Sequence, residues 1–168
     1  MNNQHETALA EESYIAYVKG SCNPQTRAGG CAYSLRAPNS SDTSEGSRKS
    51  VDTTNNIAEM QAVIDALRNT PEGKAVQIRL NSEYIKHNFE KSLPDWIKND
   101  WKKSKGKGVK NSEKWQEIQA LTTGRNVTFH KLHADDGDPE YERVSQLARK
   151  ETRKAESAIC RMAGGSRR

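Results

Sequence analysis

The stretch from residue 53 to residue 67, TTNNIAEMQAVIDAL, constrains the fold more than any other part of the chain. Two hydroxyl side chains and two amides precede an amphipathic run, and Thr or Asn at a helix N-cap satisfies free backbone N–H groups. The apolar positions recur at helical spacing and predict one buried face: Ala58, Ala62, Val63, Ala66 and Leu67, with Met60 and Ile64 beside them. Glu59 falls in the first turn. It is either a solvated first-turn acid, which the helix N-terminus favours, or an inward-facing carboxylate available for chemistry.

Strand and helix patterns alternate along the chain in an order typical of an α/β protein. Strands are predicted over residues 13–18, 29–36, 46–51, 75–80 and 126–132, with a turn beginning at Lys19. After the first helix, which should end near Asn69, further helices are predicted over residues 82–89, 93–99, 112–121 and 139–160. Three short strands in succession predict an antiparallel meander, and a strand after a crossover helix favours parallel pairing with an earlier strand.

Length and composition predict one domain with loose ends. The chain has 168 residues, of which 33% are hydrophobic and 29% charged, enough for a single buried core. We expect a flexible segment over residues 1–12, a folded domain over residues 13–160 and a basic, disordered tail over residues 161–168. No apolar run approaches a membrane span, and residues 1–12 lack the basic and apolar regions of a signal peptide.

Charge and cysteine content narrow the functional class. The net charge of +5 and the pI of about 9.1 favour a polyanionic partner. Cys22, Cys31 and Cys160 show no metal-ligand spacing and make an odd number, so we interpret them as reduced thiols. We therefore expect a cytoplasmic monomer with no membrane attachment, for which a protein partner is an alternative to nucleic acid.

The first helix resembles that of the type 1 ribonucleases H of bacteria, in which the glutamate of the pattern TTNN-x-x-E is a metal-binding catalytic acid. Other motifs of that family occur in the family's order: Gly20-Ser21-Cys22 with Gly29-Gly30, Asn81-Ser82-Glu83-Tyr84-Ile85, a lysine-rich segment after Trp96, Val109-Lys110-Asn111 with Trp115, His133-Ala134, and Pro139-Glu140-Tyr141-Glu142-Arg143. The resemblance extends from about Tyr14 to about Arg149. It implies the ribonuclease H fold, a mixed five-stranded sheet with its first three strands antiparallel and helices on both faces.

The resemblance also implies a catalytic site, which this chain has lost in part. The family cleaves the RNA strand of an RNA–DNA hybrid with two Mg²⁺ or Mn²⁺ ions held by four carboxylates. The matching positions carry Lys19, Glu59, Asn81 and Ser145, so three of the four acids are replaced. Their summed charge is zero instead of −4, and we expect no metal there. Lys19 is interpreted as an internal counter-ion for Glu59. His133 matches a histidine on a mobile loop of the family.

The positions that match nucleic-acid contacts are better preserved. Asn23 matches a residue that contacts the sugar edge of the hybrid, and Thr54, Asn55 and Asn56 match residues that hold the backbone at the helix start. A basic segment with interleaved aromatics resembles the protrusion with which some bacterial members grip the duplex. Its predicted contact residues are Trp96, Trp101, Lys102, Lys103, Lys105 and Lys107.

Three functions are compatible with these residues. The leading one is a ribonuclease H-like pseudoenzyme that binds RNA–DNA hybrid or a related duplex and does not cut it. The second is an active nuclease with a rearranged site, which would need Mg²⁺ or Mn²⁺. The third is a protein-interaction module whose old cleft is filled by Lys19 and Glu59.

Overall fold

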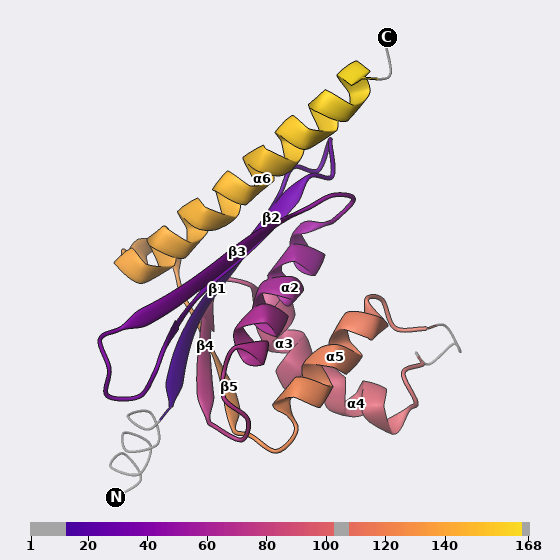
Figure 1. Cartoon of the computed structure of the whole chain (residues 1–168). Coiled ribbons are helices and arrows are strands. Elements are labelled where there is room, and N and C mark those ends of the chain that lie inside the picture. Colours follow the sequence, from indigo (N-terminus) through magenta and orange to yellow (C-terminus); the bar gives the residue numbers. More distant parts are fainter. Residues whose placement is uncertain (1–12, 103–107, 166–168) are drawn as a thin grey trace, which may run out of the picture.

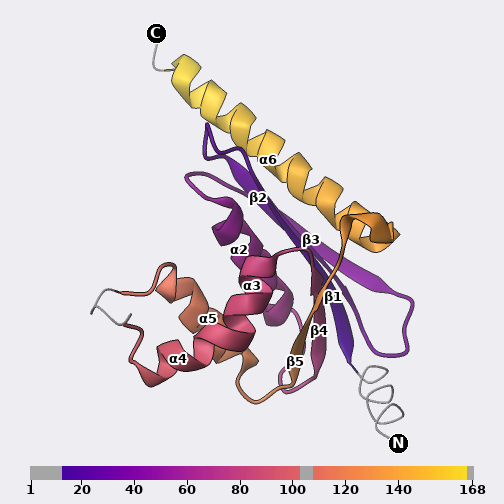
Figure 2. The same ribbon diagram turned by 180° about the vertical axis from the view of Figure 1, so that it is seen from behind.

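A mixed five-stranded sheet lies between one long helix on one face and a group of shorter helices on the other (Figures 1 and 2). The computed structural model describes residues 13–102 and 108–165. The strands are β1 (Tyr14–Cys22), β2 (Gly29–Arg36), β3 (Thr43–Ser50), β4 (Val76–Leu80) and β5 (Val127–Lys131). The helical elements are α2 (Asn55–Arg68), α3 (Glu83–His87), η1 (Asn88–Ser92), α4 (Leu93–Lys98), α5 (Ser112–Thr122), η2 (Ala134–Asp136) and α6 (Pro139–Gly165).

The sheet has the predicted topology, with one correction that bears on the site. Its order is β3-β2-β1-β4-β5; β1, β2 and β3 are antiparallel, and β4 is parallel to both β1 and β5. The predicted end of the first strand at Val18 was wrong, because β1 continues to Cys22 and pairs Lys19 with Ala32. Lys19 is therefore held in a strand, not in a turn. The third strand also begins earlier than predicted, at Thr43, because it pairs with the whole length of β2.

Helix α2 confirms the capping and burial predictions. The Thr54 hydroxyl accepts a hydrogen bond from the Ile57 N–H at 3.2 Å, so Thr54 is the N-cap. All the predicted apolar positions of the helix are buried against the sheet. The predicted place of Glu59 in the first turn was wrong, because α2 begins at Asn55 and Glu59 follows the first turn. Glu59 is 7% exposed, so of the two interpretations of this residue the inward-facing one is correct.

The two short helices predicted over residues 82–89 and 93–99 form one continuous helical run. A π-helical turn, η1, joins α3 to α4, and the Leu93 N–H donates to the Asn88 carbonyl five residues earlier. Pro94 at the start of α4 has no N–H to donate, and the ring of a proline crowds the carbonyl four residues before it in a regular α-helix. The wider π turn before Pro94 accommodates this, so the helix bends instead of stopping.

Two apolar cores hold the layers together. The larger lies between the sheet and α2, α3 and α5 and includes Trp115, which is fully buried. The smaller lies under α6 and contains Tyr17, Val144 and Ala148. Helix α6 approaches closely, because a Cβ on Gly30 would lie 2.5 Å from the Ala148 carbonyl oxygen.

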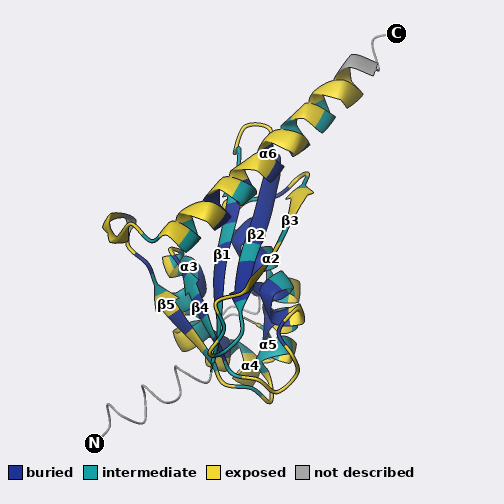
Figure 3. Cartoon of the chain, turned by 60° about the vertical axis from the view of Figure 1, so that its left-hand side comes forward, coloured by how far each residue is buried: buried dark blue, intermediate teal, exposed yellow. Residues whose placement is uncertain are grey.

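Helix α6 continues to Gly165, so the predicted tail from residue 161 was wrong at its start. The partly buried face of the helix ends at Ala158 and Ile159, and residues 160–163 are exposed. The helix extends beyond the end of the sheet, with its outer surface exposed along its length (Figure 3). Residues 1–12 and 166–168 lie outside the described part of the chain. Among the described helices, none combines the length and the apolar character needed to span a membrane.

Candidate nucleic-acid interface and altered metal site

The close approach of β1 to α2 brings Lys19 and Glu59 together. A Cβ on Gly20 would lie 2.3 Å from the backbone nitrogen of Glu59, so only glycine permits this contact. Lys19 precedes Gly20 on the strand, and its Nζ lies 3.6 Å from Glu59 Oε1. The same ammonium lies 5.9 Å from the centre of the Tyr141 ring. The expected ion pair between Lys19 and Glu59 is thus present in the structure.

Glu59 is a poorly solvated carboxylate with an incomplete set of partners. Burial raises its pKa above the ordinary value of 4.5, while the Lys19 charge and a backbone hydrogen bond from Gly20 oppose this shift without cancelling it. Within the described residues, Glu59 Oε2 has no hydrogen-bond partner. A buried carboxylate oxygen without a donor is costly, and a proton on Glu59 relieves that cost.

The other two altered positions line a cavity of about 480 Å³ with Lys19 at one side. Asn81 follows β4, and its amide nitrogen donates to the Leu132 carbonyl oxygen at 2.7 Å. Ser145, on the first turns of α6, is 3% exposed. His133 belongs to the same cavity. The structure therefore brings together Lys19, Asn81, Ser145 and His133, with Glu59 beside Lys19.

Hydrogen bonds fix the position of the loop that carries His133. The His133 side chain accepts from the backbone N–H of Asp136, and Asp136 Oδ2 accepts from the His133 N–H at 2.8 Å. Asp138 accepts from the Tyr17 hydroxyl at 2.8 Å and from the Glu140 N–H at the start of α6. Burial, and then the hydrogen bond to Asp138, raise the pKa of Tyr17, so this hydroxyl stays a donor. These bonds hold the loop against the sheet.

These side chains do not fit two divalent ions. Mg²⁺ and Mn²⁺ are bound through carboxylate oxygens, and Glu59 is the one acid among the four matching positions. In the described part of the chain, no group of three or more His, Cys, Asp or Glu side chains is arranged to hold a metal. The Lys19 ammonium stands beside Glu59, where it would repel a cation.

The start of α2 offers a separate small cavity of about 160 Å³. It is lined by Cys22, Pro24, Arg27, Thr53, Thr54 and Asn55. The first backbone N–H groups of a helix are unpaired within the helix and favour an anion. Asn23 lies beside this cavity in sequence but is internally bonded, since its amide nitrogen donates to Glu156 of α6 at 2.7 Å and its oxygen accepts from the Gln25 N–H. Asn56, also predicted as a contact, is half-buried in the first turn.

The predicted aromatic contacts are largely packed. Trp96 lies 5.6 Å from Trp115 and 6.4 Å from Trp101 between ring centres, and both Trp96 and Trp101 border the main core while staying partly exposed. Lys102 is exposed and forms an isolated bridge with Gly108. The predicted contacts Lys103, Lys105 and Lys107 lie outside the described residues.

Comparison with known proteins identifies the family. The family model described as RNase H matches residues 11–153. The chain belongs to the ribonuclease H family. It is 34% identical over 137 residues to a ribonuclease H of Cupriavidus pinatubonensis, which covers 82% of this chain and 93% of that protein. It is 38% identical over 135 residues to a ribonuclease H of Nitratidesulfovibrio vulgaris, which covers 80% of this chain and 85% of that protein.

Solved ribonuclease H structures share the fold. LC11-RNase H1 in complex with an RNA/DNA hybrid superimposes with a TM-score of 0.65 at 23% identity, over 85% of this chain and 99% of that one. LC9-RNase H1, described as a type 1 RNase H with the type 2 active-site motif, gives a TM-score of 0.73 at 22% identity, over 86% and 74%. These likenesses establish a ribonuclease H fold for this chain.

Sequence reasoning missed several residues that shape the site. Tyr141 and Arg149 line the cavity beside Ser145, and Arg79 donates to the Tyr17 hydroxyl at 2.8 Å from β4. Tyr17 was also missed, although one sequence signal pointed to it. It precedes Lys19 by two residues, and alternate residues of a strand share a face. No local pattern pointed to Arg79.

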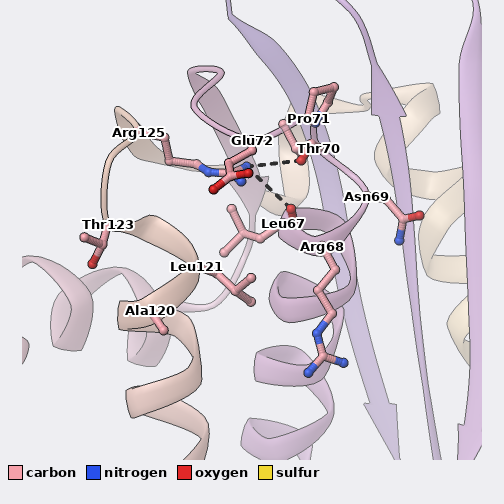
Figure 4. Close-up of a pocket in the computed structure, with 10 residues that line it drawn as sticks. All are labelled: Leu67, Arg68, Asn69, Thr70, Pro71, Glu72, Ala120, Leu121, Thr123 and Arg125. Atoms are coloured by element: carbon pink, nitrogen blue, oxygen red, sulfur yellow. Dashed lines mark hydrogen bonds between the residues drawn. The ribbon is translucent and has the colours of Figure 1, made fainter.

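Another cavity, of about 490 Å³, lies at the end of α2 (Figure 4). Arg125 reaches across it and donates to the carbonyl oxygens of Leu67 and Thr70 at 3.4 and 3.5 Å. Carbonyls in the last turn of a helix lack intrahelical partners, and a cation there is favoured by the helix dipole. We assign this cavity a structural role in ending α2.

Proposed function

We propose that this member of the ribonuclease H family binds RNA–DNA hybrid or a related duplex and does not cleave it. The observation that carries the proposal is the ammonium of Lys19, 3.6 Å from Glu59, at the position of an acid in the pattern that this chain resembles. A site of one carboxylate and one ammonium has a net charge of zero and little attraction for two divalent cations.

Retention of binding is supported by features at the start of α2 and after α4. The cavity at Thr54 and Asn55 lies at the N-terminus of a helix, where phosphate is favoured. Lys98, Lys102 and Lys110 are exposed around the partly exposed Trp101. LC11-RNase H1, which shares the fold, was solved with an RNA/DNA hybrid. Together these features favour a duplex over a protein as the partner.

A titration of labelled hybrid with the protein, across a range of Mg²⁺ and Mn²⁺ concentrations, tests both halves of the proposal. We expect binding that does not require a divalent ion and that weakens as salt is added, with intact RNA recovered at every concentration. RNA fragments that depend on the divalent ion would instead establish a nuclease with a rearranged site. Absence of binding at low salt would refute the proposal altogether.

A further inference from the structure

The outer face of α6 carries a row of basic side chains without acids. At 3.6 residues per turn, seven exposed positions fall within about one third of the helix circumference. These positions, here called the basic stripe, are Arg143, Gln146, Lys150, Arg153, Lys154, Ser157 and Arg161. They lie opposite Val144, Ala148 and Ala155, which are fully buried against the sheet. The stripe therefore points away from the sheet, as the exposed outer surface of α6 in Figure 3 shows.

Three basic side chains of the stripe form no ion pair within the part of the chain that the structure describes. Arg143 pairs with Glu45 at 3.2 Å, and Lys154 pairs with Glu151 at 3.1 Å. Within residues 13–102 and 108–165, Lys150, Arg153 and Arg161 have no ion-pair partner. The stripe thus presents a positive potential along one side of a straight helix, and such a potential attracts an extended polyanion.

The dimensions of the stripe suit a nucleic-acid strand. From Arg143 to Arg161 the helix rises by about 27 Å at 1.5 Å per residue. One strand of a duplex advances about 3.4 Å along its axis for each phosphate and winds around that axis, so the stripe spans about eight base steps and can contact those of their phosphates that face it. The C-terminal end of α6 extends beyond the sheet (Figure 1), and Arg161, in the last turns of this helix, is exposed.

A membrane surface fits α6 less well than a phosphate backbone. Helices that lie on membranes insert an apolar face between the lipids. The apolar face of α6 is already buried, with Val144, Ala148 and Ala155 at 0% exposure, and Met162 is the large hydrophobic residue it exposes. What remains accessible is charge without apolar area, which is the composition of a phosphate-binding surface.

We propose that the basic stripe binds the sugar–phosphate backbone of a second nucleic-acid segment. The first segment is the duplex of the proposed function, on which this inference rests. Its expected contacts at the start of α2 and around Lys102 lie with α2 to α5 on the face of the sheet opposite α6 (Figures 1 and 2). Asn23 is the exception, because it bonds to Glu156 of α6, but Glu156 is not part of the basic stripe. One molecule of the protein would then bridge two segments.

The decisive variant is Lys150→Gln, Arg153→Gln, Arg161→Gln. One unlabelled duplex is fixed to beads, and recruitment of a second, fluorescent duplex is measured with and without the protein. We expect the wild type to recruit the second duplex, and the triple variant to bind the beads but recruit little. Each side chain that neutralises a phosphate makes the plot of log K against log salt steeper by about 0.9. The slope for the second duplex should therefore become shallower by about 2.7 when the three side chains are replaced.

Lys74→Gln is the matched control for Lys150→Gln, since Lys74 is an exposed lysine in the turn before β4 and also lacks an ion-pair partner among the described residues. It should leave recruitment unchanged. Recruitment that persists in the triple variant would come from self-association and would overturn the inference. The inference would also be overturned if the wild type bound the first duplex but recruited no second one. Stripe-dependent binding to phosphatidylserine vesicles in place of duplex would overturn it as well. Failure of the wild type to bind the beads would refute the proposed function instead.

Discussion

Restoring the missing acids tests whether their loss is the whole defect. The substitutions Lys19→Asp, Asn81→Asp and Ser145→Asp would change the summed charge of the four positions from zero to −4. At 3.6 Å and an effective dielectric of 20, the gross Coulomb attraction between Lys19 and Glu59 is about 4.6 kcal/mol, and the first substitution turns it into repulsion. Asn81→Asp also replaces the donor that faces the Leu132 carbonyl oxygen with an acceptor.

The cost to the metal-free protein should be smaller than these gross terms. Burial already raises the pKa of Glu59, and removal of the Lys19 ammonium takes away a charge that opposes this shift, which favours the neutral carboxyl further. Breaking a buried ion pair costs about 3–5 kcal/mol, and we expect the free energy of unfolding without metal to fall by about that amount. Mg²⁺ should restore about 2.7 kcal/mol at a concentration one hundred times its dissociation constant.

The assay is urea unfolding with and without Mg²⁺, followed by incubation with labelled hybrid. We expect Mg²⁺-dependent stability and cleavage of the RNA strand alone. Lys19→Met is the control, because it removes the ammonium without adding a ligand and should show no Mg²⁺ dependence. A triple variant that folds but is insensitive to Mg²⁺ would refute the placement of the four positions around one site. A variant that binds metal and cuts nothing would refute hybrid binding as well.

Three further outcomes follow from the structure. Because burial raises the pKa of Glu59 in the folded state, the contribution of this carboxyl to stability is present at acid pH and is lost as the pH rises through the raised pKa. Glu59→Gln should therefore flatten the pH dependence of the free energy of unfolding above pH 4.5. An unchanged profile would contradict the burial argument. Replacing Lys102, Lys103, Lys105 and Lys107 with Gln should lower the salt slope of hybrid binding by about 0.9 for each of these lysines that binds a phosphate in the wild type; an equal slope in a salt titration would show that the segment is only solvated. A thiol reagent should modify exposed Cys160 first and Cys31 last, because burial raises the pKa of Cys31 to about 12; mass spectrometry showing early modification of Cys31 would rule this out.

The sequence predicted the fold well where local patterns and packing agree. The cap at Thr54 and the buried face of α2 could be predicted from hydroxyl and apolar spacing, and the mixed five-stranded sheet with three antiparallel strands followed from the family resemblance. The polar end of β1 was not predicted. Gly20 and Ser21 read as a turn, and only their pairing with β2 makes them strand. The same limit applied to α3 and α4, because a π-helical turn leaves no simple signature around Pro94.

At the site, the sequence predicted which residues gather but not how they are bonded. The pairing of Lys19 with Glu59 followed from opposite charges at matching positions. The bonds from Asn23 to Glu156 and from Tyr17 to Asp138 join residues more than 100 positions apart. Such contacts depend on how α6 crosses the sheet, which no local pattern specifies. The roles of Asn23, Thr54, Asn55 and Asn56 in nucleic-acid binding stay predictions.

The contact at Gly20 has a consequence for protein design. Because backbone rests on backbone where β1 meets α2, the spacing of positions 19 and 59 does not depend on which side chains they carry. One frame can therefore present two acids to a cation, or an ammonium and an acid to each other, without moving its strands. Chemistry can be exchanged at these two positions while the architecture is kept, provided that position 20 remains glycine.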